Sequence, residues 1–179
     1  AEADFVLFQL EIPYDTIRHT MALLETRKPM TILDPAPAPS GTLPEDMLHN
    51  VDLITPNESE AETLTGIKVT DEKSAAEASE ILMKQGAATV VIKAGGAGSY
   101  ICDEEGIRKV PGFCVEVADT TAAGDGFNAG LAFALGNGYS LDEAVRYGNA
   151  VGAMACTSLG AQSAMPRRDT VEKLLSRQE

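Results

Sequence analysis

Short apolar runs alternate with amphipathic stretches along most of the chain. The runs are rich in strand-forming residues, and several are apolar throughout, which is typical of strands buried on both faces of a parallel sheet. The predicted strands lie at 5–10, 30–33, 51–55, 89–92, 100–102, 107–110 and 113–117. Between and after them, apolar residues recur at helical spacing. The predicted helices lie at 14–28, 57–64, 71–86, from 124 onward, at 140–156 and at 169–177.

Helix-end signals support several of these boundaries. Gly66 follows the short helix as a C-terminal cap, and either Thr70 or Asp71 caps the longer helix that comes next. Ser140 and Glu143 form the pattern of a capping box at the start of a further helix. Strands that alternate with helices predict an α/β fold, a mostly parallel sheet with helices on both faces. We expect residues 1–179 to form a single α/β domain.

Composition and charge narrow the classes of partner. The 179 residues are 44% hydrophobic and 23% charged, which are ordinary values for a globular protein. Lys and Arg total 14 against 27 Asp and Glu, a net charge of −13, so bulk charge disfavours nucleic acid and anionic membranes as partners. No apolar run is long enough to span a membrane. Three widely spaced cysteines indicate free thiols in a reducing cytoplasm, and they predict no zinc site.

The segment 117–130 is the richest in candidate chemistry. A strand ends there, small residues turn, and a helix begins, so the unpaired amides of Ala122, Ala123 and Gly124 are candidates for an anion pocket. Asp125 would repel a bound anion, but it suits a base beside a transferring phosphoryl group. The alternative is that Asp119 or Asp125 only caps the helix. The spacing alone leaves both interpretations open.

Two other segments have weaker signals. Residues 92–99 contain Gly-Gly-Ala-Gly, which is neither a dinucleotide-binding fingerprint nor a Walker A loop, and taken alone it predicts a turn between two strands. Asn57 and Glu60 lie one helical turn apart at a predicted helix start. An amide and a carboxylate there suit a hydrated magnesium ion, but acidic residues in a first turn are also ordinary compensation for the helix dipole.

Four segments together resemble the ribokinase-like carbohydrate kinases in order and spacing. They are Thr-Pro-Asn-Glu-Ser-Glu-Ala-Glu at 55–62, Lys-Ala-Gly-Gly-Ala-Gly at 93–98, Asp-Thr-Thr-Ala-Ala-Gly-Asp at 119–125 and Gly-Ala-Gln at 160–162. The segments 9–11 and 34–38, and alanine at position 122, favour the ribose-phosphorylating branch of that family. The resemblance covers essentially the whole chain, and the 119–125 signature is its most specific part.

The resemblance implies phosphorylation of D-ribose to ribose 5-phosphate by MgATP. It implies that Asp125 is the catalytic base beside the sugar, and that Ala122, Ala123 and Gly124 form the anion hole for the γ-phosphoryl group. It also implies that Glu11 contacts the sugar and that Glu60 holds Mg²⁺ through water. The nucleotide-binding residues implied are Asn57, Lys93, Ala94, Gly95, Gly96, Ala97, Gly98, Gly124, Asp125 and Asn149.

The resemblance further implies a monovalent-cation site, normally occupied by K⁺. The matching positions are Asp119, Thr121, Ala155, Ser158, Gly160 and Ala164. The family often has serine where this chain has Ala164, and Ser163 is adjacent.

Members of this family run to roughly 300 residues, so this chain matches only their C-terminal, nucleotide-binding and catalytic part. We expect it to lack the N-terminal strands, the lid and most sugar contacts of a full-length homodimer, and to be inactive alone. Two alternatives stay open. One is another sugar or nucleoside kinase, such as a fructokinase, and the other is a non-catalytic module that binds adenine nucleotide.

Overall fold

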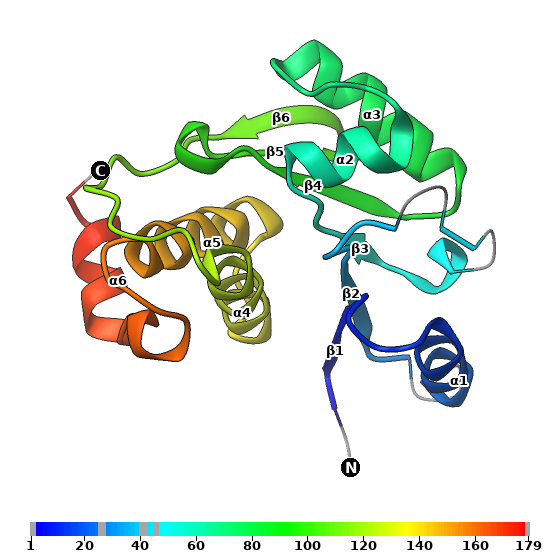
Figure 1. Ribbon diagram of the computed structural model, residues 1–179, viewed down its shortest axis with the longest axis horizontal. Coiled ribbons are helices and arrows are strands. Elements are labelled where there is room, and N and C mark those ends of the chain that lie inside the picture. The colour runs from blue at the N-terminus through cyan, green and yellow to red at the C-terminus, as the bar shows by residue number, and fades with distance from the viewer. Residues whose placement is uncertain (1–2, 25–27, 40–42, 45–46, 178–179) are drawn as a thin grey trace. The chain divides into compact units, whose positions relative to one another are not determined.

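The computed structural model describes residues 3–24, 28–39, 43–44 and 47–177. The chain divides into two compact units. Figure 1 colours the chain from its N-terminus to its C-terminus and labels the helices and strands. Unit 1 comprises Ala1–Lys93 and Tyr100–Arg108, and unit 2 comprises Ala94–Ser99 and Lys109–Glu179. The expected single domain stays a prediction, and each unit is treated by itself below.

In the described part of the chain, six strands form one sheet in sequential order, β1-β2-β3-β4-β5-β6. The first four strands pair in parallel, as the apolar runs predict. Most of their residues are buried and provide the core of unit 1. The strands are β1 (Phe5–Gln9), β2 (Met30–Asp34), β3 (Leu53–Ile54), β4 (Thr89–Lys93), β5 (Ser99–Asp103) and β6 (Gly106–Val110).

The register of the parallel strands places polar residues side by side at their carboxyl ends. Gln9 pairs with Asp34 in the β1–β2 ladder. Just beyond β3, Asn57 forms an isolated parallel bridge with Lys93, the last residue of β4. Because the carboxyl ends of parallel strands share one edge of a sheet, these four polar residues lie at the same edge.

Helices α1 (Tyr14–Leu24), α2 (Glu58–Thr65) and α3 (Glu72–Lys84) belong to unit 1, together with a 3₁₀ turn at Leu48–Asn50. Asn57 caps α2, and Gly66 ends it in the left-handed conformation. Asp71, not Thr70, is the N-cap of α3. These local signals confirm the predicted boundaries of α2 and α3. The predicted end of the first helix at Lys28 is wrong, because Lys28 is not helical and has φ of 48°.

Unit 2 contains α4 (Ala123–Gly136), α5 (Leu141–Ala155) and α6 (Arg168–Leu175), with 3₁₀ turns at Gly95–Ala97 and Gln162–Ala164. Glycines let α4 and α5 pack closely. A Cβ on Gly148 would lie 2.9 Å from the carbonyl oxygen of Phe127, and one on Gly130 would lie 2.7 Å from Val151. The capping box of Ser140 and Glu143 opens α5 as predicted. Helices on both faces of the sheet stay a prediction, because these three helices belong to the other unit.

Two strand predictions differ from the structure. The predicted strand 51–55 is reduced to Leu53–Ile54, because the Asp52 carboxylate accepts the Thr31 backbone amide at 2.7 Å and replaces a ladder bond. The predicted strand 113–117 does not form. Its side chains alternate between buried and exposed near Phe113, but no described strand pairs with it, and Val117 is 59% exposed.

Among the described residues, no helix combines the length and the apolar character that a membrane span requires.

Candidate functional site

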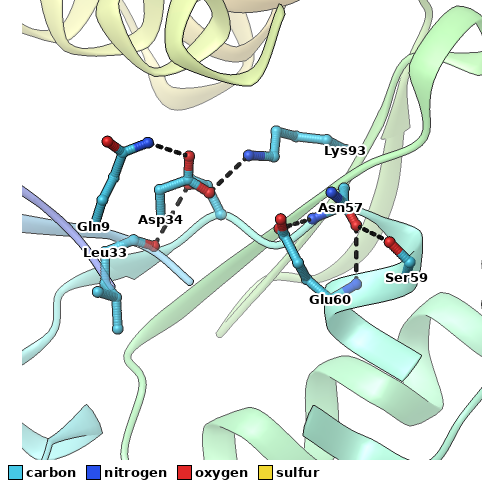
Figure 2. A network of polar contacts seen from close by, with 8 residues as sticks. Gln9, Leu33, Asp34, Asn57, Ser59, Glu60 and Lys93 are labelled. Atoms are coloured by element: carbon cyan, nitrogen blue, oxygen red, sulfur yellow. Dashed lines mark hydrogen bonds and ion pairs between the residues drawn. The ribbon is translucent and has the colours of Figure 1, made fainter. Parts of the chain in front are cut away.

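A buried ion pair lies at the carboxyl end of the sheet in unit 1. Lys93 Nζ is 2.8 Å from Asp34 Oδ1, and only 12% and 5% of these two side chains are exposed. The Gln9 amide donates to the other Asp34 oxygen at 3.4 Å, so the carboxylate joins the ends of β1, β2 and β4 (Figure 2). A pair this deeply buried holds its geometry, since either charge without its partner is strongly unfavourable.

Beside the ion pair, α2 begins with a complete capping box. Asn57 Oδ1 accepts the Glu60 amide at 2.9 Å, and Glu60 Oε2 accepts the Asn57 amide at 2.7 Å. Ser59 Oγ also donates to Asn57 Oδ1, at 2.8 Å. Figure 2 shows these contacts next to Lys93, whose amide donates to the Pro56 carbonyl at 2.8 Å. The two predicted ligand residues therefore lie together and are locked in place by each other.

The Glu60 carboxyl lies in an electrostatically mixed position. Burial raises its pKa, which the hydrogen bond from the Asn57 amide and the positive charge of Lys93 partly counteract. Asp34 raises it further. A cation bound near Glu60 would favour its charged form.

The donors at this position fit a hydrated magnesium ion. Carboxylate oxygen is the ligand that Mg²⁺ prefers, and Mg²⁺ usually keeps several waters and takes few protein ligands. Among the described residues, no cluster of three or more His, Cys, Asp or Glu side chains could enclose a metal ion. Glu60 therefore suits a contact through water, not a cage of protein ligands.

Unit 2 contains the start of α4, which differs from the start of α2 in its N-cap residue. Its N-cap residue is Ala122, in the left-handed conformation with φ of 58°, and an alanine offers no side-chain cap. Asp125 is the third helical residue and is exposed. The simple capping alternative is therefore wrong for the N-cap position, which neither aspartate occupies. The first turn presents small residues and one carboxylate. The Ala123 amide donates to the Thr120 carbonyl at 3.2 Å, so it is not unpaired as predicted.

The Asp119 carboxylate organises the loop before α4. Its Oδ1 accepts from the Thr121 amide at 2.9 Å and from the Thr121 hydroxyl at 2.7 Å, and its Oδ2 accepts from the Gly160 amide at 3.0 Å. The Gly160 hydrogen bond, followed by those of Thr121, lowers the pKa of Asp119 to about 2. A carboxylate that is ionised near neutral pH and lies among main-chain groups suits a monovalent cation.

Three of the six positions implied for that cation are thus brought together. Ala155 is the buried last residue of α5, Ser158 is exposed, and Ala164 is buried in a 3₁₀ turn. Among the described residues, none of these three makes a hydrogen bond to Asp119.

The glycine-rich segment at 94–98 forms a tight turn between β4 and β5, as its sequence predicts. The Ala94 amide donates to the Gly98 carbonyl at 2.8 Å, and the Gly98 amide donates to Gly95 at 3.0 Å. Gly95, Gly96 and Ala97 are exposed. Asn149 lies on α5 within the same unit and is buried. Its side chain is occupied by protein partners, Ser99, Val110 and Pro111, which the sequence reasoning missed.

Glu11 is exposed in the turn after β1. The preceding residue, Leu10, donates its amide to the Ala36 carbonyl at 2.9 Å, which fixes this turn against the loop after β2. The Asp34–Lys93 pair was also missed as part of the site. Charged residues at the ends of two buried strands of a parallel sheet are the signal that could have found it.

Residues 2–168 match the pfkB family of carbohydrate kinases. The chain belongs to this family. It is 42% identical over 175 residues to a ribokinase from Haemophilus influenzae, covering 97% of this chain and 56% of that protein. It is 35% identical over 173 residues to a ribokinase from Staphylococcus aureus, covering 96% and 56%. The chain thus spans about half the length of these pfkB family relatives.

Solved structures of pfkB family members agree with the fold. Ribokinase from Thermotoga maritima is similar with a TM-score of 0.85 at 38% identity, covering 97% of this chain and 57% of that one. Ribokinase from Arabidopsis thaliana, complexed with ribose and ATP, is similar with a TM-score of 0.90 at 30% identity, covering 97% and 56%. The predicted ribokinase-like α/β fold is confirmed.

Proposed function

We propose that this chain provides the nucleotide-binding and phosphoryl-transfer machinery of an ATP-dependent kinase that converts D-ribose to ribose 5-phosphate. The observation behind the proposal is the start of α4, where an exposed Asp125 lies in the first turn of a helix that has no side-chain cap at its N-cap residue. The similarity to ribokinases, one of them complexed with ribose and ATP, supports ribose as the acceptor.

Asp125 acts as the general base in this proposal. The sugar hydroxyl oxygen attacks the γ-phosphorus, the bond between the γ-phosphorus and the β–γ bridging oxygen breaks, and ADP leaves. The hydroxyl proton passes to the Asp125 carboxylate. The transition state is loose, so positioning and charge stabilisation provide most of the catalysis, and the proton moves late. The amides at Ala122 and Gly124 are preorganised donors for the phosphoryl oxygens in this proposal, and the Ala123 amide must share its proton with the Thr120 carbonyl, to which it donates at 3.2 Å.

The remaining roles follow the same proposal. Asn57 contacts the nucleotide phosphates, and Glu60 holds Mg²⁺ through water. The turn at 93–98 lines the nucleotide site, with Asn149 behind it, and Glu11 contacts the sugar. Mg²⁺ neutralises charge on the phosphates when it is bound. A monovalent cation held near Asp119 and Gly160 adds positive field beside the anion hole. K⁺ is therefore expected to raise the turnover rate of the chimera described below relative to Na⁺ or tetramethylammonium. Equal rates with the three cations would reject this site.

Two further candidates compete with this function. One is a kinase of another sugar or nucleoside, since Glu11 and Asp125 alone do not specify the acceptor. The other is an adenine-nucleotide binding module without turnover, favoured by the observation that the chain spans 56% of the Haemophilus influenzae ribokinase. For the same reason, we propose that the 179 residues alone bind adenine nucleotide but show no ribose-dependent ATP consumption. A cytoplasmic location, consistent with three free cysteines, and a homodimeric full-length form complete the proposal.

Coupled ADP release over a panel of sugars tests the function. We would assay the 179-residue chain and a chimera in which this sequence replaces the matched 175 residues of the Haemophilus influenzae ribokinase. The expected result is turnover by the chimera with ribose preferred over fructose and nucleosides, and nucleotide binding without turnover by the chain alone. A chimera that binds the ATP analogue but does not turn over ribose would reject the proposed phosphoryl-transfer role of this chain. Failure of both proteins to bind an ATP analogue would reject the nucleotide site.

A further inference from the structure

Within unit 2, the glycine-rich turn lies backbone to backbone against the segment 110–112. Gly98 has φ of 98°, and a Cβ there would overlap the main chain of Val110, Pro111 and Gly112. A Cβ on Gly112 would lie 2.6 Å from the Gly96 carbonyl oxygen. No side chain fits between the two segments, so their contact depends on groups that hold both from outside.

The Asn149 side chain is such a group. Its Nδ2 donates to the carbonyl oxygens of Val110 and Pro111, both at 3.3 Å. Its Oδ1 accepts from the hydroxyl of Ser99, the residue that directly follows the glycine-rich turn, at 2.7 Å. Asn149 is 9% exposed and Ser99 is fully buried. One amide therefore joins the end of the turn to the segment that the turn contacts.

The orientation of this amide is fixed by its partners. If the oxygen and nitrogen of the Asn149 amide were exchanged, its oxygen would face two carbonyl oxygens, which is repulsive. In the observed orientation, the Ser99 hydroxyl must be the donor, because the Asn149 oxygen that it contacts can only accept. Every polar atom of the pair is thus committed to a protein partner, and the loss of the hydroxyl would leave a buried acceptor without a donor.

The same helix reaches the start of α4. Gly152 lies one turn after Asn149 on α5, and a Cβ on Gly152 would lie 3.1 Å from the Ala123 carbonyl oxygen. One helix therefore contacts both the support of the glycine-rich turn and the first turn of α4. The outer side of the turn is open within the described part of the chain, since no residue beyond the immediate chain neighbours lies within 4 Å of a Cβ placed on Gly95 or Gly96.

We propose that Ser99, acting through Asn149, is a positioning residue that holds the glycine-rich turn against 110–112 and thereby sets the shape of the nucleotide site. The second half of this inference rests on the proposed function, because it assumes that the open side of the turn binds the nucleotide. Ser99 touches no ligand in this scheme. Its effect is to restrict the turn before the ligand arrives, which reduces the ordering that binding requires.

The test uses the 179-residue chain and the variant Ser99→Ala. Amide hydrogen exchange without ligand reports on the turn, at the hydrogen-bonded amides of Ala94, Ala97 and Gly98. We expect exchange at these amides to become about tenfold faster, since a lost buried hydrogen bond loosens the local structure. Calorimetric titration with a non-hydrolysable ATP analogue and Mg²⁺ should show binding weakened by about threefold to tenfold.

Two matched variants separate positioning from a general loss of stability. Ser79→Ala also removes a buried serine hydroxyl, but Ser79 Oγ makes no hydrogen bond of ordinary geometry among the described residues, although it lies beside the Cys102 thiol. Val171→Ala on α6 shortens a buried side chain of unit 2 that is remote in sequence from the turn. Neither variant should change exchange at the turn or the affinity for the ATP analogue.

A double variant tests the route through Asn149. Ser99→Ala added to Asn149→Ala should not speed exchange at the turn any further, because the hydroxyl then has no amide left to orient. Wild-type exchange at the turn in Ser99→Ala would overturn the proposal. Faster exchange with unchanged affinity would overturn its functional half and leave a purely structural bond. If the wild-type chain binds no ATP analogue, the proposed nucleotide site is rejected, and the exchange measurements still decide whether Ser99 positions the turn.

Discussion

Helices α2 and α4 both begin at segments for which the family resemblance implies phosphate contacts, yet their first turns differ. At α2, Asn57 and Glu60 satisfy each other's backbone amides, and Ser59 adds a third bond. At α4, the N-cap residue is Ala122, which makes no side-chain cap. The same kind of ligand is thus proposed at two different helix starts. We call the start of α2, which has a capping box, the closed turn, and the start of α4, whose N-cap residue has no capping side chain, the open turn.

The two helix starts also differ in their contributions to the stability of the fold. A capping box is worth about 1 kcal/mol to the helix that it begins. An alanine in the left-handed region costs roughly 1–2 kcal/mol, and Ala122 has φ of 58° and ψ of 16°. The α4 start therefore forgoes a local stabilisation and adds a strain. Strain of this kind is commonly found at functional sites, where the surrounding packing maintains it. Here the close contact of α4 with α5 provides that packing.

The largest effect is expected from Asp125 in the open turn. In the chimera, Asp125→Asn should lower kcat by about 100- to 10,000-fold, the usual effect of removing a general base. The affinity for the ATP analogue should change little, because the amide has nearly the same size and still offers a polar group. Steady-state kinetics and calorimetry measure the two quantities. A variant that keeps half of the wild-type kcat would show that Asp125 is not the base.

The local features of both helix starts could be predicted from the sequence. The spacing of Asn57 and Glu60, and that of Ser140 and Glu143, place partners within one helical turn, so no tertiary information is needed. The small residues at 122–124 likewise predicted a turn that a ligand can approach. The predicted parallel strands formed because continuous apolar runs have few other ways to be buried.

What the sequence did not predict depends on partners far apart in the chain. Lys93 and Asp34 are 59 residues apart, and Ser99 and Asn149 are 50 residues apart. No local pattern marks either pair, since each forms only once the fold brings the residues together. The absence of the predicted strand at 113–117 also depends on residues distant in the sequence. Its alternation was suitable for a strand, but a strand also needs a neighbour to pair with.

A smaller effect is expected when the open turn is crowded. Ala123→Val places a branched side chain beside the proposed anion hole, and in the chimera it should lower kcat by about 10- to 100-fold, less than the loss of a whole oxyanion donor. Ala129→Val is the matched control, since Ala129 is an exposed residue of the same helix. Both variants replace the same side chain by the same branched one within α4. Equal kcat values for the two, after correction for the folded fraction, would assign the small residues to packing alone.

Substitution of the N-cap residue in the closed turn should lower the free energy of unfolding and should also weaken nucleotide binding. Asn57→Ala and Ser140→Ala each remove the side-chain half of a capping box, and each should lower the free energy of unfolding by about 1 kcal/mol. Only Asn57→Ala should also weaken binding of the magnesium–ATP analogue, by about threefold to tenfold, the effect of one lost hydrogen bond. Urea unfolding and calorimetry on the 179-residue chain compare the pair. Equal affinities would restrict Asn57 to a structural cap.

The smallest effect concerns the loop before the open turn, through the ionisation of Asp119. Its carboxyl has a pKa of about 2 in the folded chain, below the ordinary value of 3.8, because Gly160 and Thr121 donate to the charged form. A lowered pKa means that the charged carboxylate stabilises the folded chain. This contribution is complete above about pH 4, and it is lost as the pH falls from there through about 2.

Urea unfolding of the wild type and Asp119→Asn, measured at intervals from pH 7 to pH 2.5, isolates this contribution. The asparagine does not ionise, so the difference in unfolding free energy between the two should stay constant down to about pH 4 and then shrink steadily. Its size should be modest, because water screens an accessible carboxylate. Thr121→Val removes one donor and raises the folded pKa toward 3.8, so the decline should end at a higher pH and be smaller in total, while it still starts near pH 4. A difference that does not change with pH would mean that the Gly160 and Thr121 bonds do not favour the charged carboxylate.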